Sequence, residues 1–202
     1  MDLIENLIKD GWLKTPGIVE AFKMVKRADF IPEGMKNLAE LDEALPIGYG
    51  QTISQPLTVA FMLEQLQPQV GDKVLDVGFG SGWTSALLGE IVGQRGKVIA
   101  IELVPELKEF GEKNAEKYNR GQVHFILGDG SKGYEKEAPF DKILSSAAVQ
   151  NEIPKDWKKQ LKIGGRIVTS IRSSIWLLVK RSKTEFKETE YPGFAFVPLV
   201  EK

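Results

Sequence analysis

Apolar residues follow two different periods along this chain, and the two periods alternate in a regular order. Five short runs rich in β-branched residues have the length and composition of buried strands, at 73–77, 97–101, 123–127, 142–145 and 166–171. Between them, apolar residues recur at helical spacing over 83–92, 105–118 and 154–161. Because strands that alternate with helices form parallel sheets covered on both faces, we expect an α/β fold with a doubly wound, mostly parallel sheet.

The start of the chain departs from this alternation. Apolar residues at helical spacing predict two short amphipathic helices, around 3–8 and 18–25. The residues from Ile31 to Pro56 then carry repeated proline and glycine, which predicts a long irregular segment. Ordered loops of this length in compact domains are usually functional, so we look for a site in this segment.

The end of the chain also changes character. Residues 175–180 and 193–199 resemble two strands with no helix between them, joined by the mixed-charge stretch 181–190. This pattern predicts an antiparallel hairpin at the edge of the sheet. No shift in composition marks a linker, so we expect one domain over residues 1–202, with 1–56 as a helical extension and covering loop and 57–202 as the core.

Composition excludes several classes of protein and of chemistry. With 42% hydrophobic and 27% charged residues the chain is expected to fold, and 27 basic against 28 acidic residues give a net charge of −1. That balance does not favour binding to nucleic acid or to an anionic membrane. The absence of cysteine and the single His124, expected to be a strand side chain, exclude disulfides, thiolate catalysis and Cys-ligated zinc, and leave little room for a Ser-His relay. We therefore expect no metal, and chemistry based on carboxylates, hydroxyls, backbone or a cofactor.

The N-terminal residues 1–6 carry acids where a signal peptide needs a basic region. No apolar run approaches the ~20 residues that span a bilayer. We expect a soluble, cytoplasmic protein, and a monomer.

A glycine-rich loop follows the first predicted core strand, in the sequence Asp-Val-Gly-Phe-Gly-Ser-Gly-Trp over residues 76–83. Glycines let a ligand approach the backbone closely because no Cβ intervenes. Trp83 stands where a dinucleotide-binding loop needs its third glycine, and no P-loop motif is present. What remains is three glycines at alternate positions with an acid two residues before the first, an arrangement that resembles the S-adenosylmethionine (AdoMet) methyltransferases.

Two further strand ends carry acids in the expected order. Glu102 ends the next strand, 20 residues after Gly82, where a carboxylate can accept hydrogen bonds from ribose hydroxyls. Asp129 follows the third strand and can receive an adenine amino group. We therefore expect a nucleoside to bind at the strand ends, against Gly78, Phe79, Gly80, Gly82, Glu102, Leu103, Gly128, Asp129 and Gly130.

The segment Leu-Pro-Ile-Gly-Tyr-Gly-Gln-Thr-Ile-Ser-Gln-Pro over residues 45–56 carries a far more specific signal. It resembles, almost letter for letter, the signature of the protein-L-isoaspartate (D-aspartate) O-methyltransferases. The similarity continues at 128–130, 138–141, 161–166 and 196–199. This resemblance implies a Rossmann-like methyltransferase fold, AdoMet as methyl donor with S-adenosylhomocysteine as product, and isoaspartyl-containing peptides and proteins as partners. The family's activity is the first step of protein repair, in which the ester formed is lost through a succinimide.

The same resemblance implies roles for individual residues. Thr52 and Ile53 would lie over the methyl donor, and the Ser54 hydroxyl would contact the acceptor carboxylate as the catalytic residue. The acceptor side would be completed by Ala147, Ala148 and Val197. A free α-carboxylate with a pKa of about 3.5 is already ionised at neutral pH. Proximity and desolvation can therefore drive methyl transfer without a general base.

This chain departs from the family pattern near the acceptor. Glu40 and Glu43 stand where an aromatic residue and an arginine are usual, Ala195 where a basic residue is common, and Phe79 where small residues are usual. Two alternatives therefore stay open. The chain could methylate a normal aspartate in one partner peptide, or it could bind AdoMet and peptide without catalysis.

Overall fold

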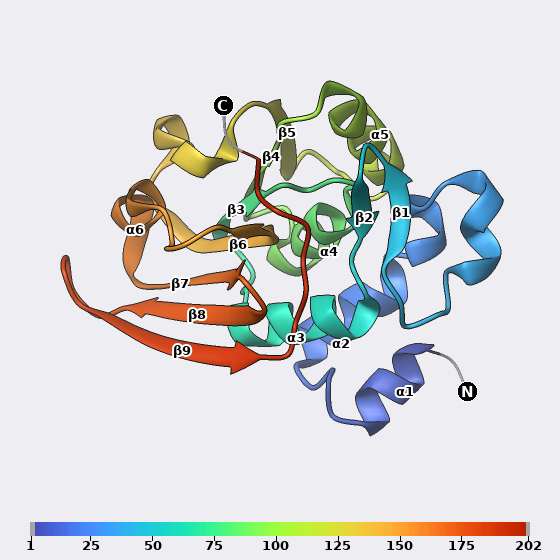
Figure 1. Cartoon of the computed structure of the whole chain (residues 1–202), viewed down its shortest axis with the longest axis horizontal. Coiled ribbons are helices and arrows are strands. Elements are labelled where there is room, and N and C mark those ends of the chain that lie inside the picture. The colour runs from blue at the N-terminus through green and yellow to red at the C-terminus, as the bar shows by residue number, and fades with distance from the viewer. Residues whose placement is uncertain (1–2, 201–202) are drawn as a thin grey trace.

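The computed structural model describes residues 3–200 and contains a seven-stranded sheet in the order β5-β4-β3-β6-β7-β8-β9 (Figure 1). The pairs from β5 to β7 are parallel, and the pairs β7–β8 and β8–β9 are antiparallel. The strands are β3 (Lys73–Val77), β4 (Lys97–Glu102), β5 (Val123–Leu127), β6 (Phe140–Val149), β7 (Leu161–Ile171), β8 (Ser174–Lys180) and β9 (Phe186–Pro192). The predicted mostly parallel sheet with an antiparallel C-terminal edge is confirmed.

Helices cover both faces of this sheet. Because neighbouring strand residues point to opposite faces, Val74 packs in one core with α1 to α5, and Leu75 in a second core with Trp157 of α6. The helices are α1 (Leu3–Lys9), α2 (Pro16–Met24), α3 (Pro56–Leu66), α4 (Trp83–Val92), α5 (Pro105–Ala115) and α6 (Lys155–Gln160). The two predicted N-terminal helices are present, and the last two helices end earlier than the periodicity predicts. None of the helices within 3–200 combines the length and the apolar character that crossing a membrane demands. Residues 1–2, which open the segment compared with a signal peptide, lie outside the described residues.

The segment predicted to be irregular contains short regular elements. Two 3₁₀ turns, η1 (Arg27–Phe30) and η2 (Glu33–Leu38), precede a hairpin of β1 (Leu45–Gly48) and β2 (Gln51–Ile53). Its two-residue turn has a positive φ at both Tyr49 and Gly50, which matches the twist of the flanking strands. The hairpin leads into α3, whose first residue, Pro56, is the last residue of the 45–56 segment.

The C-terminal hairpin uses a different second strand from the one predicted. β9 begins inside the mixed-charge stretch and ends at Pro192, whereas residues 193–199 form no strand of the sheet. They cross the end of β6, where the Ala148 N–H donates to the Val197 carbonyl and the Leu199 N–H donates to the Ala148 carbonyl, each at 2.8 Å. Figure 1 shows this last segment in red, running from β9 back over the middle of the sheet. The prediction failed because an edge strand needs little apolar content, while the apolar residues of the 193–199 run line the site and pack on α3.

Candidate active site

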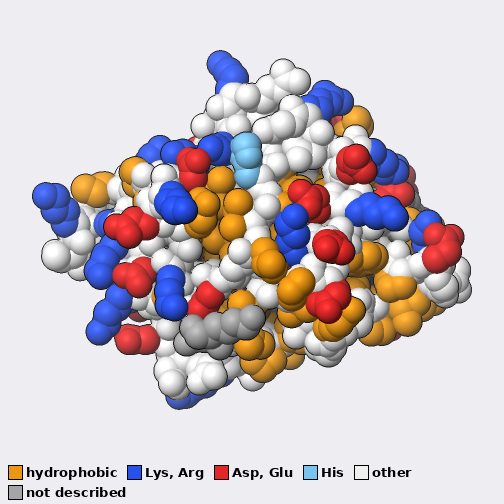
Figure 2. Space-filling view, turned by 90° about the horizontal axis from the view of Figure 1, so that it is seen from above, with side chains coloured by type: hydrophobic (Ala, Val, Ile, Leu, Met, Phe, Trp, Pro, Cys, Tyr) orange, Lys and Arg blue, Asp and Glu red, His pale blue; other side chains and the backbone are white. Residues whose placement is uncertain are grey.

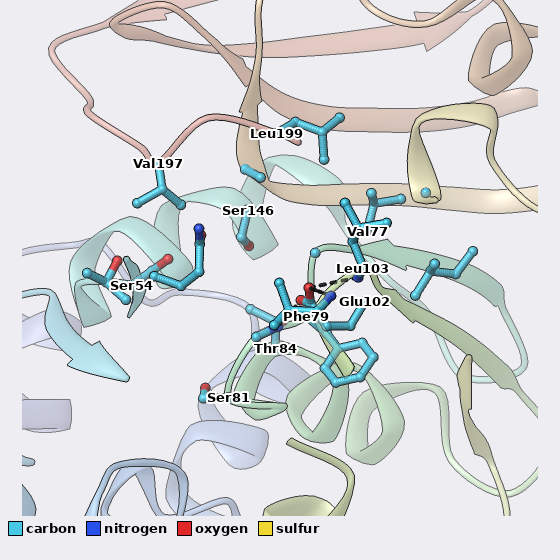
Figure 3. A pocket seen from close by; sticks show the side chains of 18 of the residues that line it. Ser54, Val77, Phe79, Ser81, Thr84, Glu102, Leu103, Ser146, Val197 and Leu199 are labelled. Atoms are coloured by element: carbon cyan, nitrogen blue, oxygen red, sulfur yellow. Dashed lines mark hydrogen bonds between the residues drawn. The ribbon is translucent and has the colours of Figure 1, made fainter. Parts of the chain in front are cut away.

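A cavity lies where the carboxyl ends of β3, β4 and β6 meet, covered by β2 and by the C-terminal segment (Figure 3). In doubly wound sheets this is the edge at which ligands bind. Twelve of the residues predicted for the site line it: Thr52, Ile53, Ser54, Gly78, Phe79, Gly80, Glu102, Leu103, Gly128, Gly130, Ala147 and Val197. Three predicted residues, Gly82, Asp129 and Ala148, lie outside this lining.

The glycine loop forms one wall of the cavity. The Gly78 N–H donates to the Ile101 carbonyl at 2.8 Å, which fixes the loop to the end of β4. Gly82 serves the packing of the loop instead. It has a φ of 85°, and a Cβ there would stand 2.3 Å from the carbonyl oxygen of Gly111 in α5. The third glycine of the motif is therefore explained by helix packing, and it lets the loop sit close to α5.

Glu102 is the buried charged group of this wall, with 7% of its surface exposed. Its Oε2 accepts the Gly80 N–H at 2.9 Å, and its Oε1 accepts those of Leu103 at 2.8 Å and Val104 at 3.0 Å. The dashed lines in Figure 3 mark contacts of this kind around Glu102. Because a carboxylate has about four acceptor directions, Glu102 can hold the loop and still accept from a ligand hydroxyl.

Asp76, the acid before the first glycine, is completely buried behind the loop. Its Oδ2 accepts hydrogen bonds from the hydroxyls of Thr84 at 2.9 Å and Ser85 at 2.7 Å, at the start of α4. Burial raises the pKa of Asp76 to about 6, and the nearby charge of Glu102 acts in the same direction. This acid therefore supports the loop from behind, while Thr84 itself reaches the cavity lining.

The third strand end contributes mainly backbone to the cavity. Gly128 and Gly130 line it, and the Trp157 indole donates to the Gly130 carbonyl at 2.9 Å. The Asp129 side chain between them accepts the Ser131 N–H at 2.9 Å and stands 3.7 Å from the Lys132 ammonium. Asp129 thus caps the short η3 turn (Gly130–Lys132) beside the cavity.

A second hollow adjoins the first. The two share Thr52, Ser54, Ser146 and Val197 in their linings, so Ser54 stands where they meet. The rest of the second hollow comes from the residue before β1, from the start of α3 and from the C-terminal segment: Ala44, Gln55, Thr58, Gly193, Phe194, Ala195 and Phe196. Ala148 lies beside it and pins that segment through its backbone.

Two side chains that were not predicted for the site hold the Ser54 segment in place. Arg27, 6% exposed, donates to the carbonyls of Ala39, Leu41, Glu43 and Ser54, at 2.6 to 3.4 Å. Burial lowers its pKa to about 10, so it stays charged at neutral pH. The Asp42 carboxylate accepts the Leu57 N–H at 2.8 Å and the Gln55 amide at 3.1 Å, which caps the start of α3.

The departures from the family pattern have different positions. Ala195 lines the second hollow, and Phe79 lines the first and packs edge-on against Phe125 at 5.1 Å. Glu40 and Glu43 are exposed, and neither lines a hollow. The cavity wall also includes residues that were not predicted for the site, among them Ser81, Thr84, Ser146 and Leu199. Of these four, only Leu199 carried a signal in the sequence, because it belongs to the apolar 193–199 run.

Metal chemistry has no counterpart in the described side chains. Across residues 3–200, His, Asp and Glu side chains do not gather in any group of three that could hold an ion. His124 is exposed on β5, outside the linings of both hollows. Acidic and basic side chains are interspersed on the face shown in Figure 2, where the histidine is pale blue.

Comparison with known proteins supplies the family. A family model described as protein-L-isoaspartate(D-aspartate) O-methyltransferase (PCMT) matches residues 1–202. A protein-L-isoaspartate O-methyltransferase of Methanopyrus kandleri is 41% identical over 204 residues, covering 98% of this chain and 89% of its own. Protein-L-isoaspartate O-methyltransferase 2 of Archaeoglobus fulgidus is 47% identical over 185 residues, with 90% and 84% covered.

The fold agrees with a solved structure as well. A Plasmodium falciparum chain assigned as a protein-L-isoaspartate O-methyltransferase, crystallised with S-adenosyl-L-homocysteine, superimposes with a TM-score of 0.88. That match covers 99% of this chain and 97% of the other at 22% identity, so it speaks for the fold. The family model and the two relatives establish that this chain belongs to the protein-L-isoaspartate (D-aspartate) O-methyltransferase family.

Proposed function

We propose that this protein transfers a methyl group from AdoMet to the free α-carboxylate of L-isoaspartyl residues in damaged polypeptides. The observation that carries the proposal is the pair of adjoining hollows with Ser54 at their junction. A donor and an acceptor that meet at one point need this arrangement, because methyl transfer requires the two reacting atoms to lie in line at close contact. The activity after which the family is named supports the same assignment.

The residues of the first hollow fit AdoMet. The Glu102 carboxylate faces a glycine loop that lets a ligand lie against the backbone, and Gly128 offers backbone on the opposite side. We assign Glu102 to the ribose hydroxyls, Gly78 and Gly80 to the close approach, and Thr52 and Ile53 to the cover over the donor. Asp129 stays our candidate for the adenine amino group, although it also caps η3. When bound, AdoMet supplies an electrophilic methyl group on a sulfonium.

The chain's own residues then position the acceptor and exclude water. The isoaspartyl carboxylate is the nucleophile and is ionised near neutral pH, so no side chain has to remove a proton. We assign the Ser54 hydroxyl as a donor to this carboxylate, and Ala147, Ala148 and Val197 as the neighbouring acceptor wall. Arg27 and Asp42 hold the Ser54 segment from behind. Desolvation by the apolar C-terminal segment strengthens these contacts.

The product of this step explains a role in repair. The new methyl ester is a better electrophile than the carboxylate. The following backbone nitrogen attacks its carbonyl carbon and closes a succinimide, and methoxide leaves with the amide proton as methanol. Hydrolysis of the succinimide returns part of the material to normal aspartate. We propose that isoaspartyl polypeptides are therefore the partners of this chain.

The deciding experiment measures methyl transfer from radiolabelled AdoMet to two synthetic peptides that differ only in the linkage of one residue, isoaspartyl or normal aspartyl. We expect transfer to the isoaspartyl peptide alone, with base-labile ester as product. Transfer to the normal aspartyl peptide would favour the aspartate-specific alternative. Binding of AdoMet without transfer to either peptide would favour the non-catalytic alternative.

We further propose that residues 1–202 act as one unit, with 1–56 covering the site on a core of 57–202, and that the protein is a cytoplasmic monomer that binds neither nucleic acid nor membrane. The near-zero net charge and the interspersed surface charges support the last point. Light scattering after gel filtration tests the monomer. A gel-shift assay with duplex DNA and structured RNA tests whether the protein binds nucleic acid. A dimer mass or a salt-sensitive shift would contradict these assignments.

A further inference from the structure

Ser146 lies near the end of β6 and lines both hollows, as does Ser54 on the opposite wall. Its Oγ is inaccessible to solvent and makes no hydrogen bond in the described structure. Figure 3 shows the two serines on separate elements, with Val197 above them. A buried hydroxyl without a partner costs stability, so its place at this junction calls for a physical reason.

The neighbouring residues show that burial in β6 does not by itself leave a serine unpartnered. The adjacent Ser145 hydroxyl donates to the Ala147 carbonyl at 3.0 Å. Ala147 and Val197, its apolar neighbours in the lining of the first hollow, give Ser146 no side-chain acceptor. Its hydroxyl is therefore a donor without a partner at the junction of the hollows, beside the place where the acceptor must lie.

We propose that the Ser146 hydroxyl is a second substrate-positioning donor, which binds the acceptor carboxylate from the β6 wall while Ser54 binds it from the other wall. This inference rests on the proposed function. A carboxylate that accepts one hydrogen bond can still rotate about the bond between its carbon and the α-carbon. Two donors from different elements fix that rotation and direct a lone pair of the attacking oxygen toward the donor methyl.

The test compares Ser146→Ala with a matched control, Ser170→Ala. Ser170 on β7 also has a buried, unpartnered Oγ, but it lines neither hollow. Both variants remove an unpartnered hydroxyl, so we expect both to melt at or above the wild-type temperature. Only Ser146→Ala should lose activity: kcat/KM for the isoaspartyl peptide falls about tenfold, and the dissociation constant for S-adenosylhomocysteine stays unchanged. Ser146→Thr, which keeps the hydroxyl, should recover part of the loss.

Several results would overturn this assignment. Wild-type kcat/KM in Ser146→Ala, or an equal loss in Ser170→Ala, would show that the hydroxyl is structural. Weakened S-adenosylhomocysteine binding would assign it to the donor instead of the acceptor. Failure of the proposed function is a separate outcome, because wild-type protein would then not methylate the isoaspartyl peptide at all.

Discussion

Glu102 has two tasks that its geometry lets it combine, because it holds the backbone of the glycine loop and faces the cavity. We expect Glu102→Gln to weaken S-adenosylhomocysteine binding about ten- to hundredfold, since a charge-assisted hydrogen bond contributes roughly 1.5–3 kcal/mol. Titration calorimetry measures the change. Glu106→Gln, an acid in the first turn of α5 that lies outside both hollows, is the matched control and should bind normally. Equal affinity in both variants would remove Glu102 from the site.

Ser54 lies at the junction of the hollows, so its hydroxyl is placed to touch the acceptor more than the nucleoside. We expect Ser54→Ala to reduce kcat/KM for an isoaspartyl peptide by about 5- to 100-fold, which corresponds to a loss of roughly 1–3 kcal/mol. Affinity for S-adenosylhomocysteine should stay within twofold of the wild type. Full activity in the variant would contradict the role assigned to this serine.

Asp76 predicts a measurable dependence of stability on pH. Its pKa is about 6 in the folded protein against 3.8 for the unfolded reference, so the folded state holds a proton over this interval that the unfolded state releases. The contribution is fully present below about pH 4 and is lost as pH rises through 6, by up to about 3 kcal/mol. The free energy of unfolding of Asp76→Asn should therefore fall less between pH 4 and 6.5 than that of the wild type. Parallel curves from denaturant titrations would contradict this.

The sequence predicts the residues whose signal is local. Glu102 and the glycines follow from a motif read along one strand and its turn, and seven residues predicted in this way meet in one cavity with five that only the family resemblance predicted. Arg27 gave no such signal, because its partners are backbone carbonyls, which every residue carries, 12 to 27 residues away. Asp42 was not predicted for the site either, because the groups that it caps lie 13 and 15 residues further along the chain. Ser146 gave no signal because a buried hydroxyl without a partner is visible only in the folded structure.

Among the elements, the inner parallel strands such as β3 and β4 were predictable because they are almost wholly buried and read as continuous apolar runs. β9 was not, because it pairs with β8 alone and exposes charged residues such as Lys187, Glu188 and Glu190. The prediction used apolar content to find strands, and it therefore placed the last strand at 193–199. That segment is apolar because Phe194 stacks on Phe61 of α3 at 5.1 Å and because Val197 lines the site.

Replacing either of two glycines by alanine should change the free energy of unfolding, in opposite directions for Gly17 in α2 and Gly82 before α4. Gly17 is exposed in the first turn of α2, and a Cβ there meets nothing within 4 Å. Gly17→Ala should raise the free energy of unfolding by about 0.5 kcal/mol, because alanine loses less backbone entropy. Gly82→Ala should lower it by several times that amount, since its Cβ would overlap the Gly111 carbonyl. Denaturant unfolding checks both, and equal effects would contradict the packing assigned to Gly82.

At the scale of the whole molecule, the second hollow is formed by segments that are far apart in the chain. Residues 52–58, 146 and 193–197 come together because β6 occupies the middle of the sheet and the chain returns across it after β9. No local motif specifies such a meeting point. The resemblance to the family predicted Thr52, Ser54 and Val197 among its lining, and the backbone pairing of Ala148 with the C-terminal segment gives the physical cause.

The composition of the whole chain predicts the pH dependence of the reaction. A histidine base would give an ascending limb near about pH 6.5, but the single histidine, His124, is exposed on β5 and lines neither hollow. The acceptor carboxylate is ionised above about pH 3.5 without help, so log kcat/KM should show no limb near neutrality that depends on His124. We expect His124→Gln to match the wild-type profile from pH 5.5 to 8, measured with an isoaspartyl peptide well below the melting temperature. A neutral limb that disappears in His124→Gln would place a base in the reaction and would point to a hydroxyl or amine acceptor in place of a carboxylate.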